Sequence, residues 1–145
     1  MDHKFKLGID WHGVMDALPQ SLAWLSRAIV DAGGEVHILT GMTWTKDCDK
    51  QLEEWGVKYT HTFSIFDHHT NIGTEIIGWH DKFNIPRISN IDWDQTKGEY
   101  CRQNNITLHL DDTTEYNKYF STPFARIWTH NDKPKRQDKP DRHKH

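Results

Sequence analysis

The sequence predicts a single α/β domain, a Rossmann-like three-layer α/β/α fold with a mostly parallel sheet. Short apolar stretches that end in a carboxylate or hydroxyl residue have the length and composition of buried strands. Helix-like segments separate them, and strands that alternate with helices form a parallel sheet covered on both faces. A chain of 145 residues fits one such domain and buries an ordinary core.

The first half of the chain is expected to supply three strands and two helices. Residues 5–9 form the first strand, which ends at Asp10. A helix follows over 20–32, and Gly33 and Gly34 end it. The next elements are expected to be a strand at 36–39, a helix at 46–55 and a strand at 57–65.

The second half continues the alternation. The expected elements are a helical segment at 67–83, a short strand or connector at 85–89, a helix from 92 to about 104, and strands at 106–110 and 125–128. Residues 1–129 thus form the folded domain. The tail over 130–145 contains Pro134, Pro140 and mixed charges, and we expect it to be disordered.

The charge is unevenly distributed. The net charge is −3, but the tail from His130 onward holds six Lys/Arg and three Asp/Glu, so the body before it is acidic. A duplex-binding protein would present a clustered basic face, so stable binding of duplex DNA is not expected.

Cysteine usage and hydropathy favour a soluble cytoplasmic protein. Cys48 and Cys101 lack the CxxC spacing of a zinc site and form no disulfide framework. No apolar run approaches the ~18–20 residues of a membrane span, and the polar start of the chain is not a signal peptide. Most of the 11 histidines are scattered singly, which favours surface or core polar roles.

A set of chemically reactive residues recurs where the expected elements begin or end. Asp10 ends the first strand, Thr40 the second and Asp111–Asp112 a later one, while Lys97 lies in the first turns of a helix. Open α/β sheets bind ligands at the carboxyl ends of their strands. With these motifs in this order over residues 5–128, the chain resembles the haloacid dehalogenase (HAD) superfamily, in its capless or small-cap phosphatase type.

The resemblance implies a nucleophile and a magnesium site. Asp10 would form an aspartyl-phosphate intermediate. Mg²⁺ would be held by the Asp10 carboxylate, the backbone carbonyl of His12 and Asp111, with waters completing the octahedron. Asp112 would be a second ligand, or would orient a bound water or the lysine.

The remaining motifs would neutralise the phosphoryl group. The resemblance implies that Thr40 and the backbone amide of Gly41 bind phosphoryl oxygens. Lys97 would balance the negative charge that gathers when carboxylates and phosphate share one pocket.

One position departs from the family pattern. The residue two after the nucleophile is usually a second aspartate that acts as general acid and base, and here it is His12. Histidine can transfer protons near neutral pH, but its longer ring places the proton differently. Superfamily members without that aspartate include slow hydrolases and enzymes of other chemistry.

Each motif also has a plain structural interpretation. Asp10 and Thr40 fit turn chemistry at strand ends, and the Asp111–Asp112 pair with its threonines fits helix capping. A lysine at a helix start is commonly solvated. Other lysines are available for its role, namely Lys46, Lys50 and Lys82.

Two other families share parts of the pattern. His68-His69 and His80-Asp81 look like the metal-binding doublets of HD-domain phosphohydrolases, but those domains are helical throughout. Receiver domains use an Asp, Thr and Lys set, but their paired acids lie on the first strand, whereas here the pair comes last.

The spacing of the motifs bears on the substrate. The 56 residues between Thr40 and Lys97 leave room for a small insertion but not for a full cap domain. An open site would admit a bulky phosphomonoester, such as a nucleotide, a nucleic-acid end or a phosphoprotein. Trp11 and Trp44 flank the expected pocket and either stack on a base or pack in the core. The favoured function is a phosphomonoester phosphatase, and the alternative is a catalytically weak HAD-like module that binds a phosphorylated ligand.

Overall fold

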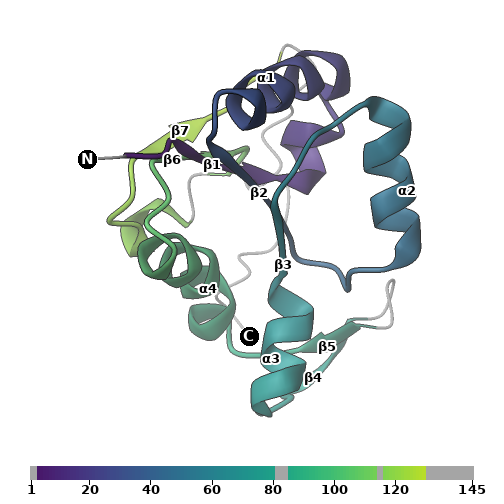
Figure 1. The fold of residues 1–145 in the computed structure, drawn as a ribbon. Coiled ribbons are helices and arrows are strands. Elements are labelled where there is room, and N and C mark those ends of the chain that lie inside the picture. Colours follow the sequence, from purple (N-terminus) through teal and green to yellow (C-terminus); the bar gives the residue numbers. More distant parts are fainter. Residues whose placement is uncertain (1–2, 81–84, 114–115, 130–145) are drawn as a thin grey trace.

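The computed structural model describes residues 3–80, 85–113 and 116–129 (Figure 1). The tail that the sequence predicts to be disordered lies outside these residues. Within the described residues, no helix combines the length and the apolar composition that crossing a bilayer requires.

A parallel sheet of five strands forms the centre of the domain, in the order β3-β2-β1-β6-β7. Its strands are β1 (Lys6–Asp10), β2 (Glu35–Thr40), β3 (His61–Ser64), β6 (Leu108–Asp111) and β7 (Phe124–Arg126). From β1 the chain moves to one side through β2 and β3, and later to the other side through β6 and β7. The strand order therefore reverses between β1 and β6, which is where open α/β sheets bind ligands. The predicted α/β class with a parallel sheet is confirmed.

Helices cover both faces of this sheet (Figure 1). They are α1 (Pro19–Asp31), α2 (Lys46–Trp55), α3 (Ile65–Ile72) and α4 (Asn90–Gln103). Because strand side chains alternate between faces, Leu7 and Ile9 pack with Leu22 of α1 and Leu52 of α2 in the larger core. A smaller core forms where Cys101 of α4 meets the opposite face.

Local sequence explains the helix ends that were predicted well. Thr45 caps the start of α2, and its side chain forms a capping box with Cys48. Gly56, in the left-handed conformation, caps the end of the helix. The helix expected at 46–55 is therefore confirmed to the residue. The expected strands at 5–9, 36–39, 106–110 and 125–128 all occur with small shifts of their ends.

The segment between β3 and α4 differs from the prediction. The strand expected over 57–65 is confined to β3, because the Ser64 hydroxyl accepts a hydrogen bond from the Asp67 amide and starts α3 at once. The helix expected over 67–83 is wrong from Gly73 to His80, because Gly73 at φ 71° ends α3. Residues 81–83 lie outside the described residues. Two short antiparallel strands follow, β4 (Gly78–His80) and β5 (Ile85–Arg87). This small insertion lies beside α3 (Figure 1).

Candidate active site

The two strands at the point of reversal both end in aspartate. Asp10 closes β1 and Asp111 closes β6, and the two residues are 5% and 0% exposed. Lys97 of α4 is buried with them, 3% exposed. Its Nζ donates to Asp10 Oδ1 at 2.5 Å and to Asp111 Oδ2 at 3.1 Å. Three residues that lie far apart in the sequence thus form one buried charge cluster.

Helix α4 brings Lys97 to this position by packing closely on the turn η2 (Asn117–Tyr119). A Cβ at Gly98 would lie 2.3 Å from the Tyr119 carbonyl oxygen, so the helix approaches this closely only because residue 98 is glycine. The ammonium also lies 5.2 Å from the centre of the Tyr116 ring.

Asp111 is held as a carboxylate by several donors. Besides Lys97, it contacts His109 Nε2 at 2.9 Å and accepts from the backbone amides of Asp112 and Thr113 at 2.9 and 3.3 Å. Burial alone would raise the pKa of Asp111. The Lys97 ammonium and the His109 hydrogen bond outweigh burial and hold this pKa well below its usual range.

His109 is a residue of the site that the sequence reasoning missed. Its ring is fully buried and stacks on Phe120 with centroids 5.1 Å apart. Burial lowers the pKa of His109, so the ring is neutral and its Nε2–H donates to Asp111. Gly8 of β1 makes room for it, because a Cβ there would lie 2.7 Å from His109 Nδ1. The available signal was the spacing of two between His109 and Asp111, which puts both on one face of a strand.

The pKa of Asp10 is shifted in the opposite direction from that of Asp111. Burial raises the pKa of Asp10 well above its ordinary value; Lys97 opposes this, while the Asp111 and Asp112 carboxylates add to it. Asp10 and Asp111 both contact the Lys97 ammonium, and the Asp112 carboxylate lies close to them. A cation bound among these carboxylates would favour the ionised form of Asp10.

The donor set fits a magnesium ion. Oxygens of Asp10, Asp111 and Asp112 lie within 4.8 Å of one another, and carboxylates are the hard ligands that Mg²⁺ prefers. Gly13 lets the third carboxylate approach. It has φ +85°, and a Cβ there would lie 2.0 Å from Asp112 Oδ2. Glycine at position 13 therefore allows both the turn after β1 and the close approach of the Asp112 carboxylate.

Thr40 and Gly41 lie at the carboxyl end of β2, next to the end of β1. Thr40 is buried, and its Oγ1 accepts from the Met42 amide at 3.1 Å, which orders the turn after the strand. Trp93 of α4 covers the next residue, because a Cβ at Gly41 would lie 2.8 Å from the indole ring. The expected phosphate-binding turn thus has an aromatic wall that the sequence reasoning did not identify.

His12 is the most exposed of the expected site residues, with 61% of its side chain accessible. Its Nδ1 lies 3.7 Å from Asp16 Oδ2, and Asp16 Oδ1 accepts from the Gly13 amide at 2.7 Å. Asp16 was not among the predicted site residues. It could have been noticed as the next acid in the same turn.

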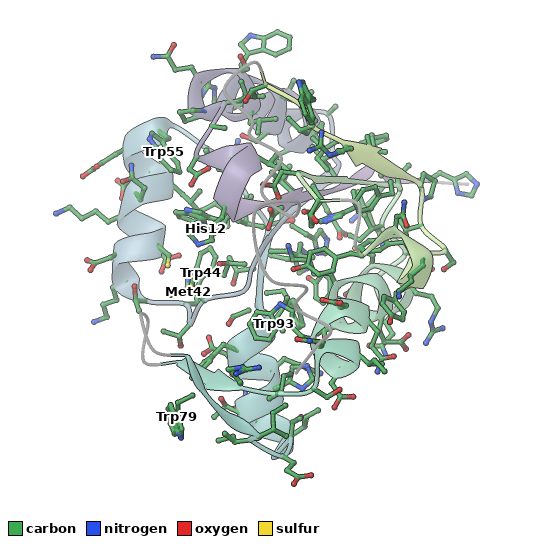
Figure 2. The ribbon with its side chains drawn as sticks, turned by 180° about the vertical axis from the view of Figure 1, so that it is seen from behind. His12, Met42, Trp44, Trp55, Trp79 and Trp93 are labelled. Atoms are coloured by element: carbon green, nitrogen blue, oxygen red, sulfur yellow. The ribbon has the colours of Figure 1, made fainter. Side chains whose placement is uncertain are left out.

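The two tryptophans expected at the pocket pack against each other. The Trp11 ring lies 5.7 Å from Trp44 and 5.6 Å from Trp55, measured between centroids, which favours the packing interpretation. Figure 2 shows that the labelled side chains, from Trp55 of α2 to Trp79 of β4, run down one side of the molecule. Trp93 lines a separate cavity of about 190 Å³ with Phe66, Ile76 and Ile88.

The side chains of the His68-His69 doublet contact residues outside this site. His69 has hydroxyl oxygens at both ring nitrogens, Thr74 Oγ1 and Thr96 Oγ1, each at 2.7 Å. The ring of His68 lies against Phe63, with centroids 5.5 Å apart. Asp81 and the side chain of His80 lie outside the described residues.

The raised pKa of Asp10 has a measurable consequence. A carboxyl group with a raised folded pKa contributes stability that is present below its unfolded pKa of about 3.9 and is lost as pH rises through the folded value. With divalent cations chelated, we expect the free energy of unfolding of wild type to fall relative to Asp10→Asn as pH rises from about 4 to 8. Urea unfolding across this range measures the difference. Parallel profiles for the two proteins would contradict the electrostatic account.

No family model matches the sequence, and no curated protein matches it. The geometry of the site is therefore the main guide to function.

Proposed function

We propose that the chain is a Mg²⁺-dependent phosphomonoester phosphatase that acts through an aspartyl-phosphate on Asp10. One observation carries the proposal. Asp10, Asp111 and Asp112 converge with the Lys97 ammonium at the point where the strand order reverses. Phosphoryl transfer needs an oxygen nucleophile and fixed positive charge around the transferred group, and this cluster contains both.

Each residue of the site would have its own role in the reaction. An oxygen of Asp10 attacks phosphorus while the bond to the ester oxygen breaks, and water then hydrolyses the acyl phosphate. Asp111 and Asp112, with Asp10, would hold Mg²⁺, which supplies charge neutralisation at the phosphoryl oxygens. Lys97 orients the Asp10 carboxylate and balances the charge of the bound phosphate. The exposed His12 side chain lies beside Asp16. His12 would donate the proton to the leaving alkoxide.

The surroundings of Trp93 bear on the leaving group. This indole lies against the Gly41 turn and also lines the cavity of about 190 Å³. An apolar cavity of about 150 Å³ is enough to bind benzene, so this cavity has room for one planar ring. The arrangement supports a phosphoester with an aromatic or nucleoside leaving group rather than a small sugar phosphate.

The test is hydrolysis of an aryl phosphate and a panel of nucleotides by wild type, His12→Ala and His12→Asp, with and without Mg²⁺. We expect Mg²⁺-dependent turnover by wild type. His12→Ala should lose about 10²- to 10⁴-fold in kcat, the usual contribution of a general acid–base, and His12→Asp should retain activity. A wild type that is inactive on every substrate, together with an inactive His12→Asp, would contradict the proposal.

His12 stands where the resemblance implies a catalytic aspartate, and this favours one second candidate, a module that binds a phosphorylated ligand without turning it over. In that case His12→Asp gains activity that wild type lacks. Calorimetric titration of wild type with inorganic phosphate in the presence of Mg²⁺ would then show binding without catalysis.

A further inference from the structure

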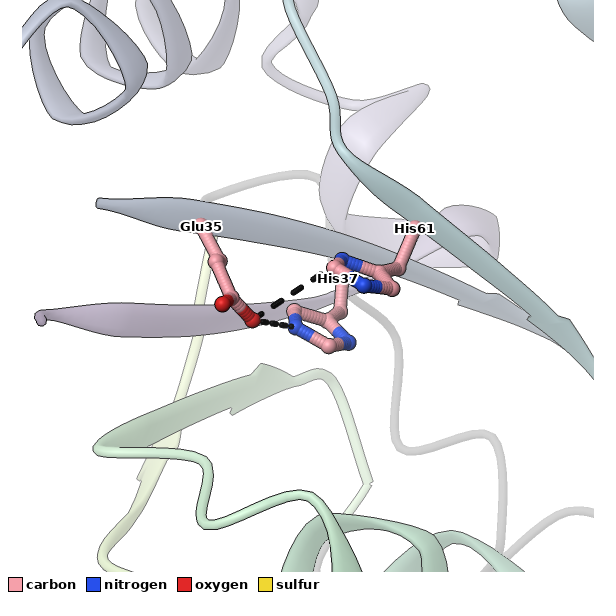
Figure 3. A group of neighbouring side chains, drawn as sticks. All are labelled: Glu35, His37 and His61. Atoms are coloured by element: carbon pink, nitrogen blue, oxygen red, sulfur yellow. Dashed lines mark hydrogen bonds and ion pairs between the residues drawn. The ribbon is translucent and has the colours of Figure 1, made fainter. Parts of the chain in front are cut away.

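A second cluster of carboxylate and imidazole side chains lies toward the amino ends of β2 and β3, whereas Asp10 lies at the carboxyl end of β1. Glu35 begins β2, and His37 follows two residues later on the same face. His61 begins β3, and the register of the two strands pairs it directly with His37. Figure 3 shows the three side chains converging on one another.

The contacts within this cluster are short. Glu35 Oε1 lies 2.9 Å from His37 Nε2 and 3.8 Å from His61 Nδ1. One ligand atom from each residue falls within 4.8 Å of the others. The two imidazole rings stack, with centroids 4.2 Å apart and planes 6° from parallel.

We propose that Glu35, His37 and His61 form a zinc site. Two imidazole nitrogens and one carboxylate oxygen are a borderline-soft donor set that suits Zn²⁺ better than Mg²⁺. At a Zn–N distance of about 2.0–2.1 Å, two ligand atoms of a tetrahedral ion lie about 3.4 Å apart. The two distances from Glu35 Oε1 bracket this value. A water would occupy the fourth position.

The surroundings of His37 are those of a metal-binding histidine. Its side chain is 1% exposed, and its Nδ1 lies 2.7 Å from the Tyr100 hydroxyl on α4. Such a partner on the second nitrogen fixes the ring and leaves Nε2 directed at the ion. Burial lowers the pKa of His37, and the His37 hydrogen bond lowers the pKa of Glu35, so a neutral imidazole faces a carboxylate. The carboxylate is the form of Glu35 that binds metal. His37 binds through Nε2 when its proton lies on Nδ1, where the N–H donates to the Tyr100 hydroxyl.

Zinc binding depends on the orientation of the His61 ring and on the charge of the neighbouring Lys6. The stacked rings cannot both direct an in-plane lone pair at one ion, so His61 must turn about its side-chain bonds. Its side chain is 48% exposed, which leaves room for that rotation. Lys6 is the register partner of Glu35, so its positive charge acts on the site, and its Nζ donates to the Asn104 carbonyl oxygen at 3.4 Å.

The position of the site indicates a structural role. β3 is an edge strand of four residues, and a shared ion would tie it to β2. Through the Tyr100 hydroxyl the same ion would be coupled to α4. Bound metal would therefore stabilise the folded chain, because the unfolded chain does not present the three ligands together.

The experiment is a Zn²⁺ titration of the full chain, in buffer that already contains Mg²⁺, followed by calorimetry and by thermal unfolding. We expect wild type to bind one Zn²⁺ that raises Tm, with the rise reversed by chelator. His61→Ala should abolish this rise and weaken binding at least tenfold. Tyr100→Phe should weaken binding by about 10- to 100-fold, the usual effect of losing an outer-shell partner.

The matched control is His3→Ala, which removes an exposed histidine outside the cluster and should leave the Tm rise unchanged. All variants keep the histidines of the C-terminal tail, so zinc bound there is common to them all. Glu35→Gln removes the carboxylate while preserving side-chain size, and should also abolish the Tm rise. An equal rise in wild type and His61→Ala, or no rise in wild type, would overturn the proposal. Neither result depends on phosphatase activity.

Discussion

Asp10→Asn is expected to abolish Mg²⁺-dependent hydrolysis, with a fall in kcat of about 10⁴-fold or more, as is typical when a covalent nucleophile is removed. The amide has nearly the same shape as the carboxylate but cannot attack phosphorus. Steady-state assays on an aryl phosphate measure the loss. Mass spectrometry of acid-quenched protein should detect a phosphorylated species in wild type and none in the variant.

The same substitution should leave the fold intact, which separates a chemical effect from a structural one. Asp111 keeps its ion pair with Lys97, and the repulsion between Asp10 and the other carboxylates is removed. The matched control is Asp31→Asn, which removes an exposed carboxylate paired with Lys58 on the surface and should keep full activity. Wild-type turnover by Asp10→Asn would rule out the covalent mechanism.

Lys97→Met is expected to have the largest effect on stability. Methionine fills a similar volume but leaves the buried Asp10 and Asp111 carboxylates without their cation. Removing one partner of a buried ion pair typically costs about 3–5 kcal/mol. Urea unfolding with chelator present measures this change, and added Mg²⁺ should restore part of the loss because the ion replaces the missing charge.

The control for this prediction is Lys58→Met, which breaks the exposed pair with Asp31. Surface pairs of this kind contribute about 0–1 kcal/mol. Equal losses of stability in Lys97→Met and Lys58→Met would show that the buried cluster is not the stabilising centre that its geometry indicates. The double variant Lys97→Met/Asp10→Asn should recover part of the loss, because one buried charge is then removed.

The sequence predicted the parts of the site that local patterns encode. Asp10, Thr40 and Asp111 follow apolar strands, and the carboxyl ends of parallel strands meet at one edge, so their proximity follows from the fold class. Lys97 lies within a helix, where a lysine carries no such signal of its own. The geometry shows that it is buried between two carboxylates.

The residues that the sequence did not predict depend on register and packing. His37 and His61 look like scattered histidines until the pairing of β2 with β3 sets them side by side. Trp93 reaches Gly41 only through the placement of α4 on the sheet. The helix expected over 67–83 was overextended because its apolar spacing continued past Gly73, where the left-handed conformation ends α3.

The pairing of β1 with β6 also determines when the site can form during folding. Lys97 and Asp10 are 87 positions apart in the chain, and the strands that carry Asp10 and Asp111 pair across a similar separation. Contacts of such high sequence separation are slow to form, because the intervening chain must be ordered before they contribute. During synthesis, β1, β2 and β3 can pair as soon as they emerge, but the carboxylate cluster must wait for β6. Recovery of the proposed phosphatase activity in a refolding experiment should therefore lag behind the recovery of helical signal.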